Sequence, residues 1–406
     1  MATKEFRGWV IVISLAILLG TVYGTTLSSI SVFLLPVIET FGCTTTQASQ
    51  ATTAFMLAMT IALPVVGWML DRVRPQIVMI GGILLTAMGS LIAAHSSTIA
   101  IYTAAMALSG VGVGASTYVP SIVVISDWIT ERRGLAFGIL LSGGSIGSAA
   151  FPVLVTDWIS VVGWRSTMQG ITWLTVAIAI PILLLVRTNP MPSMVEAGKD
   201  GAVLPGVELG QALRMPVYWL FVLQQVLAMS SGMAIYFYIV PYMTAMGHSA
   251  HSAVLLYGAT GITGLAGFIL FGVLADRFGA MRALTMGFSI CALGVLPLLT
   301  LNGLSPSLGA PLVFVVFWGA TFSLSSQLAP LLLVDLLGAR NFGVLIGISG
   351  FLSGLAGAVG PMGTALIYDT TKSYAPAFMV CALLMALAVV PALLMPVTSR
   401  KVTSGI

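Results

Sequence analysis

The charged residues of this chain are confined to short gaps between long apolar stretches. Only 7% of the residues are charged and 58% are hydrophobic, whereas a soluble domain carries roughly a quarter charged residues. About 20 apolar residues suffice to cross a bilayer as a helix, and twelve such stretches can be marked. They are 9–36, 47–69, 76–94, 99–126, 135–156, 166–186, 215–244, 252–274, 283–301, 309–333, 342–367 and 376–396. The chain is therefore predicted to be an all-α membrane protein with twelve transmembrane helices.

The basic residues indicate which gaps share a side of the membrane. Alternate gaps hold fourteen Lys and Arg residues, and the intervening gaps hold only Arg165 and Lys372. The fourteen are Lys4, Arg7, Arg72, Arg74, Arg132, Arg133, Arg187, Lys199, Arg214, Arg277, Arg282, Arg340, Arg400 and Lys401. Because cytoplasmic loops are enriched in Lys and Arg, both termini are predicted to be cytoplasmic, with the protein in the cell (inner) membrane. The net charge of +4 follows from this topology and does not indicate nucleic-acid binding.

One segment divides the chain into two similar halves. Residues 187–214 combine Pro, Gly and charged residues and are predicted to form a cytoplasmic linker between two six-helix bundles, 1–186 and 215–406. Gly67-x-x-x-Asp71-Arg72 recurs at an offset of 205 as Gly272-x-x-x-Asp276-Arg277. Further matches at offsets of 208 to 210 join Pro120, Asp127, Gly134 and Pro152 to Pro330, Asp335, Gly343 and Pro361. Ordered matches at a nearly constant offset indicate a duplicated bundle.

Two six-helix halves with Gly-x-x-x-Asp-Arg after the second and eighth helices resemble the major facilitator superfamily over essentially the whole chain. Other strings resemble the monocarboxylate porter group of bacterial organic-anion transporters. They are Gly8-Trp9-Val, Tyr118-Val-Pro120 through Asp127-Trp128, Arg132-Arg133-Gly134-Leu-Ala-Phe-Gly138, Gly163-Trp164-Arg165, Val240-Pro241-Tyr242, and Ala329-Pro330 through Asp335-Leu-Leu-Gly338. The resemblance implies a secondary transporter that moves a small, monocarboxylate-like organic anion by alternating access. The substrate would bind near the bilayer midplane.

The resemblance also implies charged residues that this chain lacks. Monocarboxylate porters commonly carry an Arg in the eighth helix, where Phe268 stands here. Animal relatives carry a Lys in the first helix, near Ser28, and an Asp in the eighth, at the place of Gly264. Ionisable residues are costly at the membrane midplane and functional by default, and no apolar stretch has one at its middle.

Neutral polar side chains are then the candidates for substrate binding. An amide buried without a partner costs roughly 4–8 kcal/mol on alkane-like scales, so each Gln must face protein, water or substrate. The predicted substrate-binding residues are Tyr23, Ser28, Tyr118, Gln224, Gln225, Ser231, Tyr236, Tyr238, Phe268 and Gln327. The alternatives are hydrogen bonds of Ser to the helix backbone and, for Phe268, ordinary packing.

Helical spacing sorts the candidates of the seventh helix. Gln224, Ser231, Tyr238 and Tyr242 recur on one face of that helix. The alternative for Tyr236, Tyr238 and Tyr242 is the interfacial aromatic belt, where Tyr242 is expected.

The resemblance gives the duplicated loops a different role. In the superfamily, the Asp after the second helix and nearby Arg residues tie the halves together when the transporter opens outward. Asp71 is expected to accept hydrogen bonds at a helix amino terminus, where the helix dipole favours an anion, and to pair with Arg133. The predicted cytoplasmic gate consists of Asp71, Arg72, Arg133, Asp276 and Arg277. The alternative is that these charges only set the topology.

Two other functions remain open. A transporter or exporter of a neutral or amphipathic compound is favoured by the absent Arg and by 21 Met residues, which can form an adaptable apolar cavity. A membrane sensor would bind solute without moving it, but the longest internal loop, about 28 residues at 187–214, offers no output domain.

An enzyme, a cofactor and a metal site are not expected, because no nucleophile–base set, phosphate loop or metal-binding cluster is present. The expected partners are a small-molecule substrate and the lipid bilayer. Proton coupling is left open, and the protein is expected to be a monomer.

Overall fold

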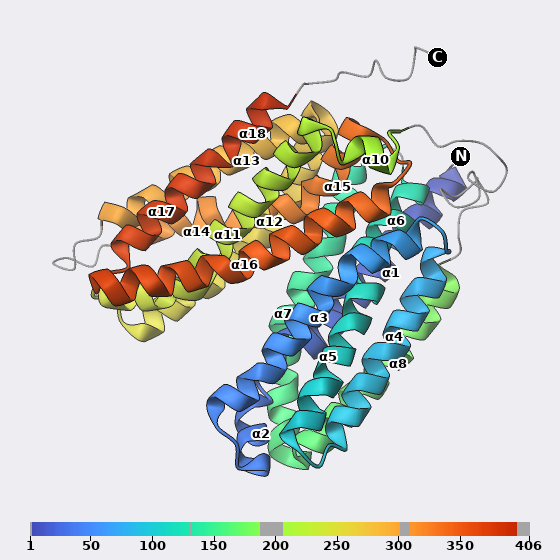
Figure 1. Ribbon diagram of the computed structural model, residues 1–406, viewed down its shortest axis with the longest axis vertical. Helices are drawn as coiled ribbons and strands as arrows, with labels where there is room; N and C mark the ends of the chain where they lie inside the picture. The colour runs from blue at the N-terminus through green and yellow to red at the C-terminus, as the bar shows by residue number, and fades with distance from the viewer. Residues whose placement is uncertain (1, 130, 187–205, 301–308, 396–406) are drawn as a thin grey trace. The chain divides into compact units, whose positions relative to one another are not determined.

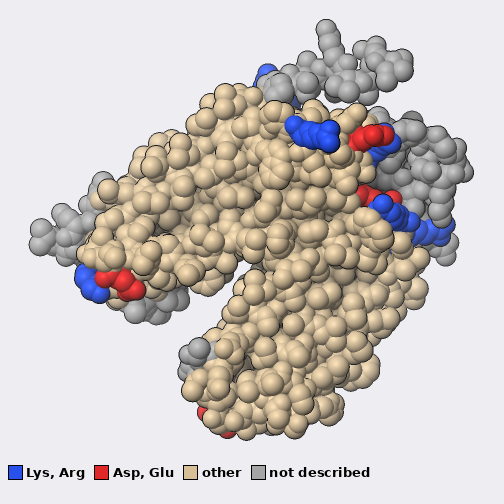
Figure 2. Space-filling view, viewed as in Figure 1, with Lys and Arg blue, Asp and Glu red and all other residues tan. Residues whose placement is uncertain are grey.

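The structure, a computed structural model, describes residues 2–129, 131–186, 206–300 and 309–395. Twelve helical segments in these ranges are long and apolar enough to cross a membrane, which confirms the predicted all-α architecture. Figure 1 shows these helices, and Figure 2 shows that Lys, Arg, Asp and Glu on the visible surface lie at helix ends while the helix walls are uncharged. Such walls suit contact with lipid chains.

The chain folds into two compact units. The first unit comprises Met1–Thr130, Ile139–Leu204 and Phe342–Ile348. Its elements are α1 (Ala2–Val22), η1 (Tyr23–Ser28), α2 (Leu34–Phe41), α3 (Thr45–Leu70), α4 (Pro75–Ala94), α5 (Ile99–Ser116), α6 (Tyr118–Trp128), most of α7 (Arg133–Val162), α8 (Trp164–Leu185) and the first residues of α16 (Phe342–Thr371). In this unit α5 packs against α3 and α4, and α4 packs against α8 (Figure 1).

Two predicted spans of the first unit are interrupted helices. The span predicted at 9–36 contains the π-helical turn η1 and a non-helical stretch before α2. The span predicted at 99–126 breaks at Thr117, which has φ −113° and ψ −101°. Pro120 has no N–H to donate to the carbonyl four residues back, and the Thr117 hydroxyl donates to the Val113 carbonyl at 2.6 Å. Hydropathy alone does not reveal such breaks, because the apolar run continues through them.

The second unit comprises Glu131–Gly138, Pro205–Asn341 and Ser349–Ile406. Its elements are α10 (Leu209–Ala212), α11 (Pro216–Ala245), α12 (Ala250–Phe278), α13 (Ala280–Val295), η2 (Leu296–Thr300), α14 (Gly309–Thr321), α15 (Leu324–Leu337), most of α16, α17 (Ala375–Leu387), α18 (Val389–Leu394) and the first residues of α7. Here α11 packs against α17, and α14 packs against α12 and α13. Most of the predicted linker, 187–205, lies outside the described residues.

One expectation for α11 is wrong. The sequence places Tyr242 in the interfacial belt, but its side chain is fully buried. The ring stacks on Phe378 at 4.3 Å between centroids, and the hydroxyl donates to the Leu298 carbonyl at 2.7 Å. The position near a helix end suggests the belt, whereas packing against α17 and η2 satisfies both the ring and the hydroxyl inside the unit.

Candidate functional site

Asp71 directly follows α3 in the first unit and links this helix end to α16. Its two carboxylate oxygens accept hydrogen bonds from the backbone N–H groups of Gly343 at 2.9 Å and Val344 at 3.1 Å. These residues form the first turn of α16, whose dipole favours an anion at this position. The predicted hydrogen bonding of Asp71 at a helix amino terminus thus has its acceptor and donors in place. We refer to this contact of Asp71 with Gly343 and Val344 as the first crossing.

The charge of Asp71 is held at a desolvation cost. Burial raises the pKa of the Asp71 carboxyl above its ordinary value, while the N–H groups of Val344 and Gly343 and the Arg72 charge act to lower that pKa. Gly67 lets the two helices approach, because a Cβ atom there would lie 1.9 Å from the Gly343 carbonyl oxygen. The first crossing therefore combines close backbone approach with one half-buried carboxylate.

Asp276 makes the corresponding contact in the second unit. Its carboxylate accepts hydrogen bonds from the N–H of Gly134 at 2.7 Å and of Leu135 at 2.9 Å, in the first turn of α7. A Cβ atom on Gly272 would lie 2.6 Å from the Gly134 carbonyl oxygen. We call this contact the second crossing. The recurring Gly-x-x-x-Asp motifs therefore perform the same task twice, each on the start of a helix from the other half of the sequence.

Gln327 adds a brace to the second crossing. Its amide nitrogen donates to the Phe268 carbonyl of α12 at 2.7 Å and to the Gly134 carbonyl of α7 at 3.1 Å. The side chain has no exposed surface, and its Oε1 has no hydrogen-bond partner among the described residues. The Gln327 donors are thus used to join α15, α12 and α7, which leaves only the acceptor for any ligand.

The three arginines of the predicted gate lie at the ends of three different helices. Arg72 is exposed and lies 4.3 Å from the Trp68 ring centroid, and it also donates to the Trp68 carbonyl at 3.2 Å. Arg277 is exposed in the last turn of α12, where a cation complements the helix dipole. Arg133 is close enough to Asp335 for its charge to act on that carboxylate. The expected pairing of Asp71 with Arg133 stays a prediction.

The first unit brings together two predicted substrate residues. Tyr23 in η1 hydrogen-bonds to the side chain of Thr117, at the break between α5 and α6. Tyr118 follows Thr117 and lies within electrostatic range of Tyr23. Ser28 is half-buried at the end of η1. Two irregular turns, one in each of two spans, therefore converge on a pair of tyrosines.

On α11, the predicted substrate residues face different neighbours. Gln224 is fully buried, and neither atom of its amide has a partner among the described residues. Ser231 is also fully buried and donates to the Cys381 carbonyl of α17 at 2.8 Å. The Gln225 amide nitrogen reaches the Ser325 carbonyl at 3.4 Å, while Gln225 Oε1 and the Ser325 hydroxyl have no partner in the described part of the chain. The face carrying Gln224 and Ser231 is thus directed into the second unit.

The aromatic candidates of the second unit lie near other rings. Tyr236 is 43% exposed, with its ring centroid 5.3 Å from that of Tyr257. Tyr238 pairs with the Tyr374 ring at 5.7 Å. Phe268 is buried, and its carbonyl accepts the Gln327 amide.

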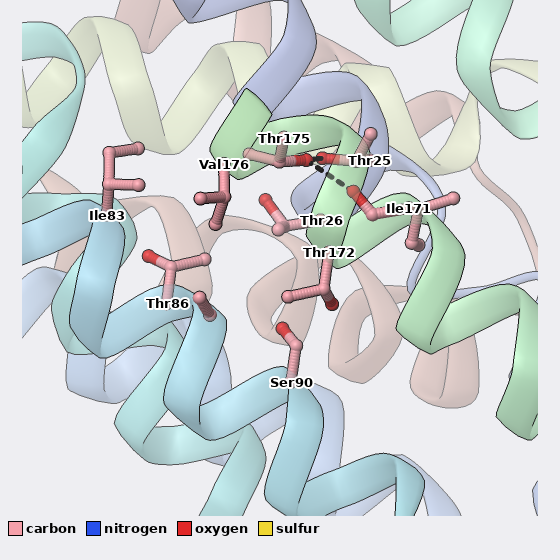
Figure 3. A pocket seen from close by; sticks show the side chains of 10 residues that line it. Thr25, Thr26, Ile83, Thr86, Ser90, Ile171, Thr172, Thr175 and Val176 are labelled. Atoms are coloured by element: carbon pink, nitrogen blue, oxygen red, sulfur yellow. Dashed lines mark hydrogen bonds between the residues drawn. The ribbon is translucent and has the colours of Figure 1, made fainter. Parts of the chain in front are cut away.

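A cluster of hydroxyls in the first unit is not among the sequence predictions. Thr and Ser side chains of η1, α4 and α8 surround a small cavity (Figure 3). The signal available in the sequence is the helical spacing of Thr86 with Ser90 and of Thr172 with Thr175. Three segments distant in the sequence build this cavity, so no single motif indicates it.

Comparison with known proteins gives one family. The model of the Major Facilitator Superfamily matches residues 16–361. An MFS-type transporter of Gibberella moniliformis is 26% identical over 79% of this chain and 75% of its own length. Monocarboxylate transporter 13 of Bos taurus is 24% identical over 92% of this chain and 85% of its own.

A solved structure agrees with the fold. The Escherichia coli fucose:proton symporter FucP superposes with a TM-score of 0.76 over 97% of this chain and 99% of its own, at 16% identity.

Proposed function

The chain belongs to the major facilitator superfamily, and on this premise we propose that it is a secondary transporter that moves a small organic anion, monocarboxylate-like, by alternating access. The observation that carries the transport proposal is the pair of aspartate crossings. Each carboxylate caps the start of a helix from the other half of the sequence through two N–H groups. Such a contact can form and release as a unit, because it consists of hydrogen bonds at one helix turn.

The crossings serve as the gate. We assign Asp71 and Asp276 to holding α16 and α7, and Gln327 to bracing the second crossing through Phe268 and Gly134. Arg72, Arg133 and Arg277 supply positive charge at the same helix ends. By the positive-inside rule the gate and both termini face the cytoplasm, in the cell (inner) membrane. The halves 1–186 and 215–406, joined by 187–214, form the two bundles of a monomer.

The side chains proposed to contact the substrate are uncharged. Tyr23 and Tyr118 converge in the first unit, and Gln224 and Gln225 lie in the second, where the Gln224 amide nitrogen has no hydrogen-bond partner among the described residues. Ser28, Ser231, Tyr236, Tyr238, Phe268 and Gln327 complete the proposed set. The similarity to monocarboxylate transporter 13 over 92% of the chain supports an organic anion. Coupling to a proton is left open.

Transport or export of a neutral or amphipathic solute is the second candidate. It is favoured by Phe268, an apolar residue at the place where the monocarboxylate porters carry Arg. Buried amide oxygens that lack a partner in the described ranges can accept hydrogen bonds from a neutral solute as well as from water.

Uptake by proteoliposomes tests the proposal. Purified full-length protein is reconstituted and offered labelled monocarboxylates, dicarboxylates, sugars and amphipathic neutral compounds, in both gradient directions. Saturable, protein-dependent monocarboxylate flux supports the first candidate, and flux of neutral solutes alone supports the second. Binding of solute without flux would identify a sensor and overturn transport.

A further inference from the structure

The hydroxyl-lined cavity of the first unit lies between η1, α4 and α8 (Figure 3). Its volume is about 20 Å³, enough for a single ligand the size of a water molecule. Six hydroxyl side chains line it, with Ile83, Ala87, Ile171 and Val176 filling the remaining wall. The six are Thr25, Thr26, Thr86, Ser90, Thr172 and Thr175. None of the lining residues is charged, so hydroxyl oxygens determine what the cavity can bind.

On α4, the hydroxyl protons are directed away from the cavity. Thr86 donates to the Gly82 carbonyl at 3.0 Å. Ser90 and Ser109 lie 3.0 Å apart, and Ser109 donates to the Thr86 carbonyl at 3.1 Å. Because Ser109 uses its proton on that carbonyl, Ser90 must be the donor to Ser109. Both cavity hydroxyls of α4 therefore present only lone pairs.

The same holds on α8 and η1. Thr172 donates to the Met168 carbonyl at 2.7 Å, and Thr26 donates to the Val22 carbonyl. The Thr175 hydroxyl lies within hydrogen-bond distance of the Ile171 carbonyl, at 2.8 Å. Thr25 has the Thr21 carbonyl at 2.7 Å, and its hydroxyl lies 3.0 Å from that of Thr175. However these last two protons are shared, both stay within the wall, so the cavity offers oxygen acceptors and no donors.

We propose that this cavity binds a dehydrated Na⁺ ion. Hard cations take oxygen ligands, and secondary transporters bind Na⁺ where a membrane helix is irregular, as the first span is at η1. An anion finds no donor here. A divalent ion would lack a carboxylate to offset its desolvation, since the ten lining residues include no acid. Neutral oxygens on three helices thus suit a single monovalent ion.

Sodium binding is placed to act on transport, and this part rests on the proposed function. The turn η1 carries Thr25 and Thr26 at the cavity and also Tyr23, which hydrogen-bonds to Thr117. Because one short π-helical turn holds both groups, Na⁺ held by Thr25 and Thr26 fixes the position of Tyr23. Sodium would then raise the apparent affinity for substrate.

The binding step is tested without any substrate. The melting temperature of the purified full-length protein in detergent is measured in NaCl and in choline chloride at equal ionic strength. At tenfold excess over its Kd, Na⁺ should raise the melting temperature by about 2–3 °C, and the shift should saturate with Na⁺ concentration. Equal melting in both salts would mean that the cavity holds water only, and would overturn the proposal.

Isosteric variants locate the ion. Thr86→Val and Thr172→Val each remove one cavity oxygen while keeping side-chain shape. Each should raise at least tenfold the Na⁺ concentration that gives half of the maximal melting-temperature shift. Thr285→Val is the matched control, because Thr285 donates to the Met281 carbonyl of α13 and is not a cavity residue. A Na⁺ shift unchanged in both cavity variants would place the ion elsewhere. If neither variant folds, the parent comparison still decides whether Na⁺ binds.

Flux measurements test the coupling. Uptake into proteoliposomes in NaCl should exceed uptake in choline chloride, and the substrate KM should be lower in NaCl. This difference in KM should be absent in Thr172→Val. Equal uptake together with a Na⁺-dependent melting shift would overturn the coupling and retain the site. Absence of flux for every solute would overturn the proposed transport function while the melting result stands.

Discussion

The two aspartate crossings use the same motif but are built differently. At the first crossing, a half-buried Asp71 is the side chain that accepts the α16 N–H groups. At the second, Asp276 is exposed, and the fully buried Gln327 amide supplies two further hydrogen bonds to the joined helices. At the matching place in the first half, the Thr117 hydroxyl donates to the Val113 carbonyl of α5 and hydrogen-bonds to Tyr23. The hydrogen bonds of the two crossings are therefore distributed differently among side chains.

This difference predicts which crossing depends more strongly on its Asp. The first crossing depends on a single side chain, the half-buried Asp71 carboxylate, which accepts both N–H groups of α16. The second crossing shares its energy between a solvent-screened carboxylate and a buried neutral brace. We expect the first crossing to respond to the loss of its Asp more strongly than the second.

The largest effect is expected for Asp71→Ala. The substitution leaves two N–H groups of the α16 first turn without their acceptor, at a cost of roughly 1–3 kcal/mol for each buried group. Amide hydrogen exchange at Gly343 and Val344 should accelerate by roughly tenfold or more, and net transport should slow. Asp71→Asn keeps one acceptor oxygen and should fall between the alanine variant and the parent. Unchanged exchange in both variants would return Asp71 to the role of a topology-setting charge.

Gln327→Leu should have the next largest effect. It removes the donor to the Phe268 and Gly134 carbonyls while preserving apolar volume, which we expect to cost about 1–2 kcal/mol. Exchange in the first turn of α7 should rise several-fold, and exchange in the first turn of α16 should not change. An effect confined to substrate affinity, with normal exchange, would instead place Gln327 at the substrate.

Asp276→Ala should matter less than either of these changes. Its carboxylate is exposed, and the Gln327 brace remains, so a cost of about 1 kcal/mol is expected. The decisive comparison is the double variant with Gln327→Leu, measured by exchange at Gly134 and Leu135. A double effect larger than the sum of the single effects would show that the two groups share one contact. If Asp276→Ala equals Asp71→Ala, the two crossings are equivalent and the comparison fails.

Arg72→Gln should have the smallest effect. Arg72 is exposed and bonds to Trp68 within its own helix end, so the change in exchange at Gly343 should correspond to less than about 0.5 kcal/mol. A loss comparable to that of Asp71→Ala would make the Arg72 charge part of the gate itself.

Much of the fold followed from the order of residues. Twelve apolar runs predicted the spans, and Gly-x-x-x-Asp-Arg repeated at an offset of 205 predicted the duplication and the importance of Asp71 and Asp276. The motif did not reveal which N–H groups these carboxylates bind, because Gly343 and Gly134 lie 272 and 142 residues away from their respective partners. Hydropathy likewise passed over η1 and the break at Thr117, where backbone geometry changes without any change in polarity.

The sequence by itself determined that this protein is a duplicated twelve-helix membrane protein, since a long apolar run has few alternatives to a membrane helix. Only the tertiary structure decided the duties of its polar groups. Gln327 and Gln224 are the same residue type, yet Gln327 joins three helices by hydrogen bonds. The Gln224 amide is buried with no partner among the described residues. Thr86 and Thr172 became a cavity wall only when α4 and α8 packed together. A hydrogen bond depends on where two distant backbones meet, and that meeting is settled by packing over the whole chain.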